Sequence, residues 1–117
     1  NCKFVQSDVL SWKFKNSDLC VFLGLTDWLS LEQMKAIFSS IQSENILFSY
    51  TEVARLNPYR LYRRVVDGPT KSATYEARTY STDAIKNILA NTDYEIKKLE
   101  KPDLVDPGAL IWAKKCR

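Results

Sequence analysis

The chain has 117 residues, of which 45% are hydrophobic and 26% are charged, and its formal net charge is +3. This length suits one domain, and this balance is typical of a globular protein rather than a disordered one. With three glycines and no histidine, the sequence holds no glycine-rich phosphate loop and lacks the commonest general base, which argues against an enzyme.

The first predicted elements form a strand, a helix and a strand. Residues 19–25, "LCVFLGL", are a short unbroken apolar run, which is typical of a central strand. Ser30 and Gln33 match a capping box, and apolar residues recur at helical spacing over residues 31–41, so we expect a helix there. Residues 44–53 are rich in aliphatic and aromatic side chains and predict a second strand.

The next stretch, residues 57–64, reads "NPYRLYRR" and carries much of the positive charge. Asn57 is a good helix N-cap and Pro58 fits the first helical position. At helical spacing the tyrosines share one side with the apolar residues, while the three arginines fall on the other. This pattern favours a short helix, and a hairpin of residues 60–66 with 72–80 is the alternative.

The last predicted elements are a strand, a helix and a strand. Residues 72–80 alternate in strand fashion, and Ser81 or Thr82 caps a helix over residues 83–91. Residues 93–100 alternate as a half-exposed strand. In the tail, an Asp-Pro-Gly turn precedes three apolar residues that are expected to be buried: Leu110, Ile111 and Trp112.

This order predicts an α+β fold of the ferredoxin-like (split βαβ) type. Its four-stranded antiparallel sheet has two helices on one face, with a short inserted helix and terminal extensions. The segments "CVFLGL", "GLTDWLSLEQMKAIFSSIQ" and "TYEARTYSTDAIKNIL" resemble the RNA-recognition motif (RRM) family. The resemblance covers about residues 18–101 of a single domain, leaving extensions at 1–17 and 102–117 and an insert at about 55–70.

The resemblance also implies a surface, because RRM domains stack RNA bases on aromatic residues of the first and third strands. The matching positions are Val21, Tyr75 and Ala77, of which only Tyr75 is aromatic. We therefore expect a non-catalytic module for protein–protein assembly within a ribonucleoprotein, with these three residues as its patch and another protein or a second copy as its partner. The alternative is binding of single-stranded RNA, through Arg60, Arg63, Arg64, Tyr75, Arg78 and Lys97.

The cysteines and the apolar runs bear on cofactors, compartment and membrane insertion. Cys2, Cys20 and Cys116 match no zinc pattern, and no metal or cofactor is expected. Sparse cysteines favour an intracellular protein, nuclear or cytoplasmic, although pairing of Cys2 with Cys116 in a secreted protein is the alternative. No apolar run approaches the roughly 18 residues of a membrane span. Because the chain begins with Asn1, we expect a processed protein or a piece of a larger one.

Overall fold

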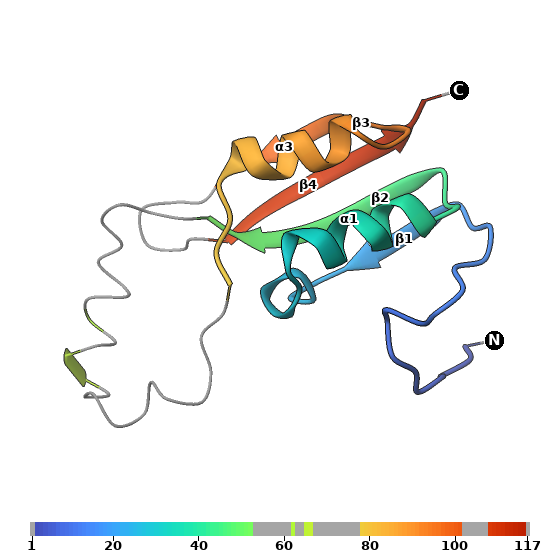
Figure 1. The fold of residues 1–117 in the computed structure, drawn as a ribbon, viewed down its shortest axis with the longest axis horizontal. Coiled ribbons are helices and arrows are strands. Elements are labelled where there is room, and N and C mark those ends of the chain that lie inside the picture. Colours follow the sequence, from blue (N-terminus) through green and yellow to red (C-terminus); the bar gives the residue numbers. More distant parts are fainter. Residues whose placement is uncertain (1, 53–61, 63–64, 67–77, 102–107, 117) are drawn as a thin grey trace.

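The computed structural model describes residues 2–52, 62, 65–66, 78–101 and 108–116 (Figure 1). The elements in chain order are β1 (Leu19–Phe22), the short 3-10 helix η1 (Thr26–Trp28), α1 (Leu31–Ser40), β2 (Asn45–Thr51), α3 (Thr82–Ala90), β3 (Tyr94–Glu100) and β4 (Gly108–Lys115).

The strands form one mixed sheet in the order β1-β2-β4-β3. β1 and β2 are parallel, with Val21 opposite Leu47. β4 lies antiparallel between β2 and β3. The chain therefore reaches the far edge of the sheet with β3 and returns to fill the gap with β4.

Local sequence explains where the helices begin. The Ser30 hydroxyl accepts the N–H of Gln33 at 3.2 Å, and the Gln33 side chain accepts the N–H of Ser30 at 2.9 Å, which completes the predicted capping box. α3 begins in a similar way, because the Ser81 hydroxyl accepts the N–H of Ala84 at 3.1 Å.

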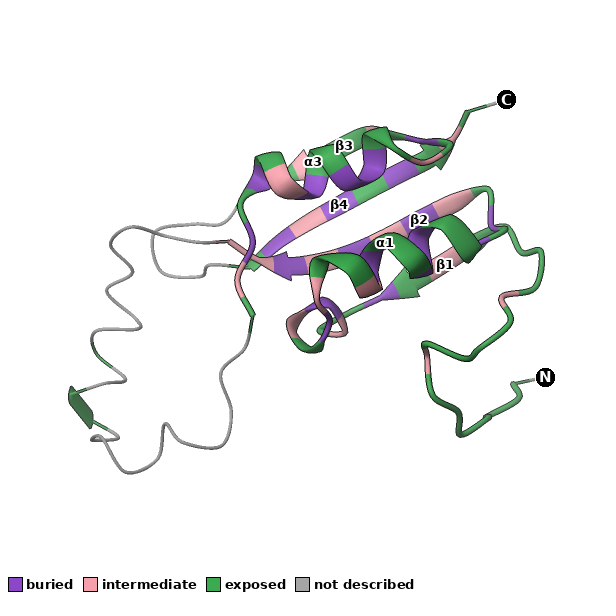
Figure 2. Ribbon diagram, in the orientation of Figure 1, coloured by how far each residue is buried: buried purple, intermediate pink, exposed green. Residues whose placement is uncertain are grey.

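Both helices cover the same face of the sheet, and their buried sides meet the strands there (Figure 2). In β2 every second residue is buried, so Ile46, Phe48 and Tyr50 point into this layer. The rings of Phe38 in α1 and Phe48 lie 4.9 Å apart between centroids. One hydrophobic core thus lies between the helices and one sheet face, with Met34, Ile37, Phe38, Ile85, Ile88 and Leu89 as the helical members.

The prediction of an α+β fold with four strands and two helices is confirmed, but the ferredoxin-like antiparallel sheet is not what the structure contains. β1 and β2 are neighbours and parallel, whereas the prediction had no parallel pair. Residues 108–115, expected to be an extension, are a central strand with small buried alanines. Periodicity identifies which residues form a strand, but it does not identify the neighbouring strand.

The insert is described only in part. Tyr62, Val65 and Val66 are helical, as predicted, but they are exposed rather than packed against the core. Most of the strand predicted at residues 72–80 lies outside the described residues, and Tyr80 makes an isolated parallel bridge with Glu52. All three cysteines are free thiols. Within the described ranges, no helix has the length and apolarity needed to cross a bilayer.

Candidate active site

The parallel pair of strands defines one edge of the sheet as the place to look for a site. In open α/β sheets, ligands bind in a crevice outside the carboxyl ends of parallel strands. β1 ends at Phe22 and β2 ends at Thr51, and because the strands are parallel both ends open at the same edge. The residues that follow these two strands are therefore the first candidates for function.

The loop after β1 is fixed against β2 by two hydrogen bonds. Gly24 has φ 73°, a conformation that glycine adopts without strain, and its N–H donates to the Ser49 hydroxyl at 2.9 Å. The buried Thr26 hydroxyl donates to the Ser49 carbonyl at 2.7 Å. Because Thr26 is the first residue of η1, these bonds hold the next residue, Asp27, beside the end of β2.

Asp27 is half-buried and is held from two sides. Its carboxylate accepts a hydrogen bond from the Thr51 hydroxyl at 3.0 Å. Its carbonyl accepts the N–H of Arg78 at 3.0 Å. The carboxylate is thus fixed in position while part of the side chain still reaches solvent.

Glu52, the residue after β2, ends a chain of hydroxyl groups that begins in the core. Its carboxylate accepts a hydrogen bond from the Thr82 hydroxyl at 2.6 Å. The Thr82 oxygen also lies 2.8 Å from the hydroxyl of Tyr50, which is 1% exposed. Because Thr82 has one proton and donates it to Glu52, Tyr50 must donate to Thr82. Burial raises the pKa of Tyr50, and the negative charge of Glu52 adds to that rise.

Tyr80 joins the returning chain to the same strand end. Its N–H donates to the Thr51 carbonyl at 2.9 Å, and its hydroxyl donates to the carbonyl of Leu29. Burial raises the pKa of Tyr80, and the neighbouring Arg78 works against that rise. Residues 78–82 therefore form a fixed border of the site.

The two carboxylates are separate anchoring points rather than a shared pair. Successive side chains of a strand point to opposite faces, so Thr51, which holds Asp27, and Glu52 lie on different sides of the strand end. Each carboxylate also has its own threonine donor. Such an edge can accept hydrogen bonds or a proton from a hydroxyl or amine group. Among the described residues there is no group of three or more potential metal ligands.

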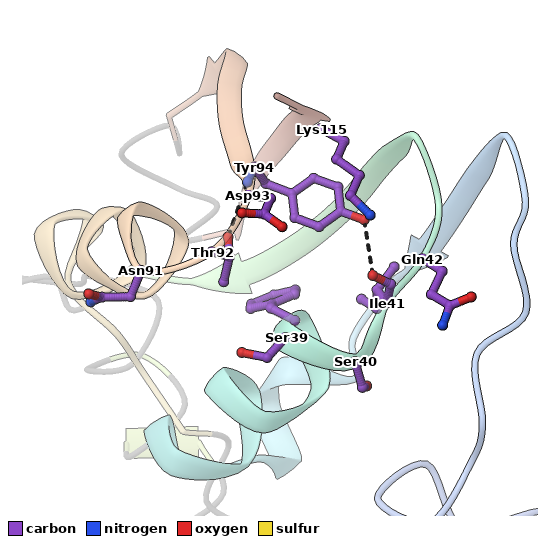
Figure 3. A pocket seen from close by; sticks show the side chains of 10 residues that line it. Ser39, Ser40, Ile41, Gln42, Asn91, Thr92, Asp93, Tyr94 and Lys115 are labelled. Atoms are coloured by element: carbon purple, nitrogen blue, oxygen red, sulfur yellow. Dashed lines mark hydrogen bonds between the residues drawn. The ribbon is translucent and has the colours of Figure 1, made fainter. Parts of the chain in front are cut away.

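A pocket of about 530 Å³ lies at the opposite edge of the sheet (Figure 3). It is bordered by the residues after α1 and α3 and by Tyr94, whose hydroxyl donates to the carbonyl of Ser43 at 2.5 Å. Lys115 at the end of β4 also lines it. Because β1 and β2 begin at this edge, the rule for ligand sites in parallel sheets does not apply to it.

The residues predicted from sequence are not gathered in one place. Arg60, Arg63, Arg64, Tyr75 and Ala77 lie outside the described residues. Val21 is exposed on β1, whereas Lys97 lies on β3 at the far edge and pairs with Glu95 at 2.6 Å. Only Arg78 borders the candidate site, through its backbone bond to Asp27.

Sequence reasoning missed Asp27 and Glu52. The available signal was a polar residue shortly after each of two strands, in "GLTDW" and "SYTEV". That signal has meaning only when the strands are known to be parallel neighbours.

No family model matches the chain, and no curated protein matches it significantly in sequence. Solved structures do match. Magnesium protoporphyrin IX methyltransferase (ChlM) from Synechocystis PCC 6803 with bound SAH has a TM-score of 0.70 and 14% identity, over 96% of this chain and 50% of its own. The pyocyanin biosynthetic protein PhzM has a TM-score of 0.67 and 10% identity, over 94% of this chain and 34% of its own.

A third similar structure is an O-methyltransferase family 2 protein from Planctomyces limnophilus in complex with apigenin. Its TM-score is 0.66 and its identity 16%, over 93% of this chain and 34% of its own. The chain spans half the length of ChlM and about a third of the other two. At these identities the likeness concerns the fold.

These findings correct the earlier interpretation. Two of these three similar structures are methyltransferases and none is an RRM domain, so the RRM resemblance is wrong. The expectations of a non-catalytic RRM-like module and of ribonucleoprotein assembly followed from that resemblance and are contradicted with it. A partner protein, a second copy or RNA as the partner stays a prediction. The argument against an enzyme, which rested on missing histidine and glycine motifs, is contradicted too, because the proteins of like fold are enzymes.

Proposed function

We propose that the chain is part of the catalytic domain of a methyltransferase that uses S-adenosylmethionine, and that the carboxyl ends of β1 and β2 border its active site. The observation that carries this proposal is the sheet itself: a parallel β1–β2 pair followed by the β4 strand inserted antiparallel. More than nine-tenths of the chain matches each of the two methyltransferases described above.

The open space at the end of β1 suits a bound cofactor. A Cβ added at Gly24 would meet no atom within 4 Å, so the backbone here can be approached closely. Gly24 and Leu25, which follow β1, would lie against the cofactor. When bound, S-adenosylmethionine supplies an activated methyl group on a positively charged sulfur.

The chain's own carboxylates suit an acceptor that carries a hydroxyl group. Asp27 and Glu52 would accept hydrogen bonds from the acceptor, and one of them would take its proton as the new bond to oxygen forms. The Thr51 and Thr82 hydroxyls would keep each carboxylate oriented. The hydroxyl chain links Glu52 to the core, because Tyr50 donates to Thr82 and Thr82 donates to Glu52.

The test uses the product of the complete reading frame. Calorimetric titration with S-adenosylmethionine is expected to show binding, and tritiated methyl groups are expected to appear on a member of a panel of phenols and other hydroxyl compounds. Glu52→Gln or Asp27→Asn is expected to lower turnover about 100-fold or more. Glu95→Gln on the exposed part of β3 is the control and should leave turnover unchanged. Failure to bind the cofactor would refute the proposal.

A further inference from the structure

η1 carries Asp27, one of the two carboxylates of the candidate site, and it is a single 3-10 turn over Thr26–Trp28. Such a turn makes few internal hydrogen bonds, and their geometry is poorer than in an α-helix, so its position depends on what holds it from outside. Its first residue is held by the bond from the Thr26 hydroxyl to the Ser49 carbonyl. Its other end needs a separate attachment.

Tyr80 supplies this attachment. Leu29 ends η1, and its N–H donates to the Thr26 carbonyl at 3.2 Å. The carbonyl of Leu29 accepts the hydrogen bond from the Tyr80 hydroxyl. Tyr80 is 7% exposed and Leu29 is 6% exposed, so water is largely excluded from this bond. A hydrogen bond that is shielded from water is electrostatically stronger than an exposed one.

The backbone of Tyr80 is fixed at the same time to the end of β2. Its N–H donates to the Thr51 carbonyl at 2.9 Å, and Tyr80 forms the parallel bridge with Glu52. One residue thus links the end of β2 with the end of η1. Two residues earlier, the N–H of Arg78 donates to the Asp27 carbonyl at 3.0 Å, which adds a second link to the same turn.

These links bear on the carboxylate of Asp27, because its hydrogen-bond donor lies on β2. The Thr51 hydroxyl donates to this carboxylate at 3.0 Å, which requires η1 and the end of β2 to keep a constant separation. Tyr80 bonds to both of these elements. Burial raises the pKa of Tyr80, so its hydroxyl keeps its proton and remains a donor at neutral pH.

We propose that Tyr80 is a positioning residue for the candidate active site: its buried hydroxyl fixes η1 against the end of β2 and so keeps the Asp27 carboxylate in place against the hydroxyl group of the acceptor. This proposal rests on the proposed function, which gives Asp27 its role. Tyr80 acts through Leu29 and η1 rather than by contact with the acceptor. Removal of its hydroxyl should therefore slow turnover and leave the binding of S-adenosylmethionine unchanged.

The experiment compares Tyr80→Phe with Tyr94→Phe in the product of the complete reading frame. Tyr94 is the matched control, because it is 5% exposed and its hydroxyl donates to the backbone carbonyl of Ser43 at the opposite edge of the sheet. Each change removes one buried hydroxyl and keeps the ring, so both should lower the melting temperature by similar amounts. Only Tyr80→Phe should lower kcat, by about 10-fold, because a small displacement of a catalytic group slows the reaction. The Kd for S-adenosylmethionine should be the same in both variants as in the wild type.

Equal turnover of the two variants would overturn the proposal, because the hydroxyl of Tyr80 would then contribute to stability alone. Hydrogen exchange at the amide of Arg78, which donates to Asp27, gives a second readout that needs no reaction. This exchange should become faster in Tyr80→Phe and not in Tyr94→Phe, and unchanged exchange in Tyr80→Phe would also refute the proposal. If the wild type binds no S-adenosylmethionine, the proposed function fails, and the exchange at Arg78 still decides whether Tyr80 holds η1 and Asp27 in position.

Discussion

The hydroxyl chain at the end of β2 yields a quantitative test of the structure. Thr82 receives a hydrogen bond from the buried Tyr50 and donates one to Glu52. Thr82→Val keeps the shape of the side chain but removes both bonds. Tyr50→Phe removes only the first of them, because Thr82 can still donate to Glu52.

The structure predicts different costs for the two changes. Tyr50→Phe should cost about 1 kcal/mol of unfolding free energy, which is the usual net worth of one hydrogen bond. Thr82→Val leaves the Tyr50 hydroxyl buried without its partner and removes a bond to a charged group, so its cost should be about 2–4 kcal/mol. In the double variant no orphaned hydroxyl remains, and its cost should fall below the sum by about 1–2 kcal/mol.

Urea unfolding followed by circular dichroism at neutral pH measures all four proteins of this cycle. A smaller loss in the double variant than the sum of the single losses is the expected result. Additive losses would refute the reasoning, because they would mean that the two hydroxyls do not interact. Ser39→Ala is the control: it removes an exposed hydroxyl that bonds within α1, and it should show no coupling to Tyr50→Phe.

Three further results are expected. Gly24→Ala should cost about 1 kcal/mol in urea unfolding, because φ 73° is strained for a residue with a Cβ; an unchanged midpoint would contradict this. Ser30→Ala should cost about 1 kcal/mol by removing one half of the capping box, whereas Ser30→Asp should retain most of the stability. Burial raises the pKa of Tyr94, so the stability that it contributes is complete below the unfolded value of about 10 and is lost as pH rises through the higher folded value. Tyr94→Phe should therefore weaken the fall in unfolding free energy measured between pH 9 and pH 11, and an unchanged pH dependence would refute this.

The elements that sequence predicted well are those whose signals are local. The capping residues Ser30 and Ser81 and the apolar stripes behind them are sufficient to locate α1 and α3 within one residue at each end. β2 and β3 were found from their composition and alternation. These signals act over a few residues, so tertiary contacts did not override them.

The arrangement of the strands could not be predicted in the same way. The apolar composition of β1 and β2 is compatible with either direction of pairing. The three buried residues of β4 include two alanines that carry little apolar signal: Ala109 and Ala113. The candidate site depends on this arrangement, because Asp27 and Glu52 are separated by β2 and α1 in sequence. They border the same edge of the sheet only because β1 and β2 are parallel neighbours.

The same topology shows where the chain on either side of the arginine-rich insert is held. The chain leaves the sheet at Glu52 and returns at Arg78, and both ends are fixed at the end of β2: Tyr80 donates to Thr51, and Arg78 donates to Asp27. Residues 55–78 contain six basic and two acidic side chains. Sequence reasoning placed this charge in an insert, with contact to RNA as the alternative function. The described residues on either side of it, Glu52 and Arg78, border the candidate active site.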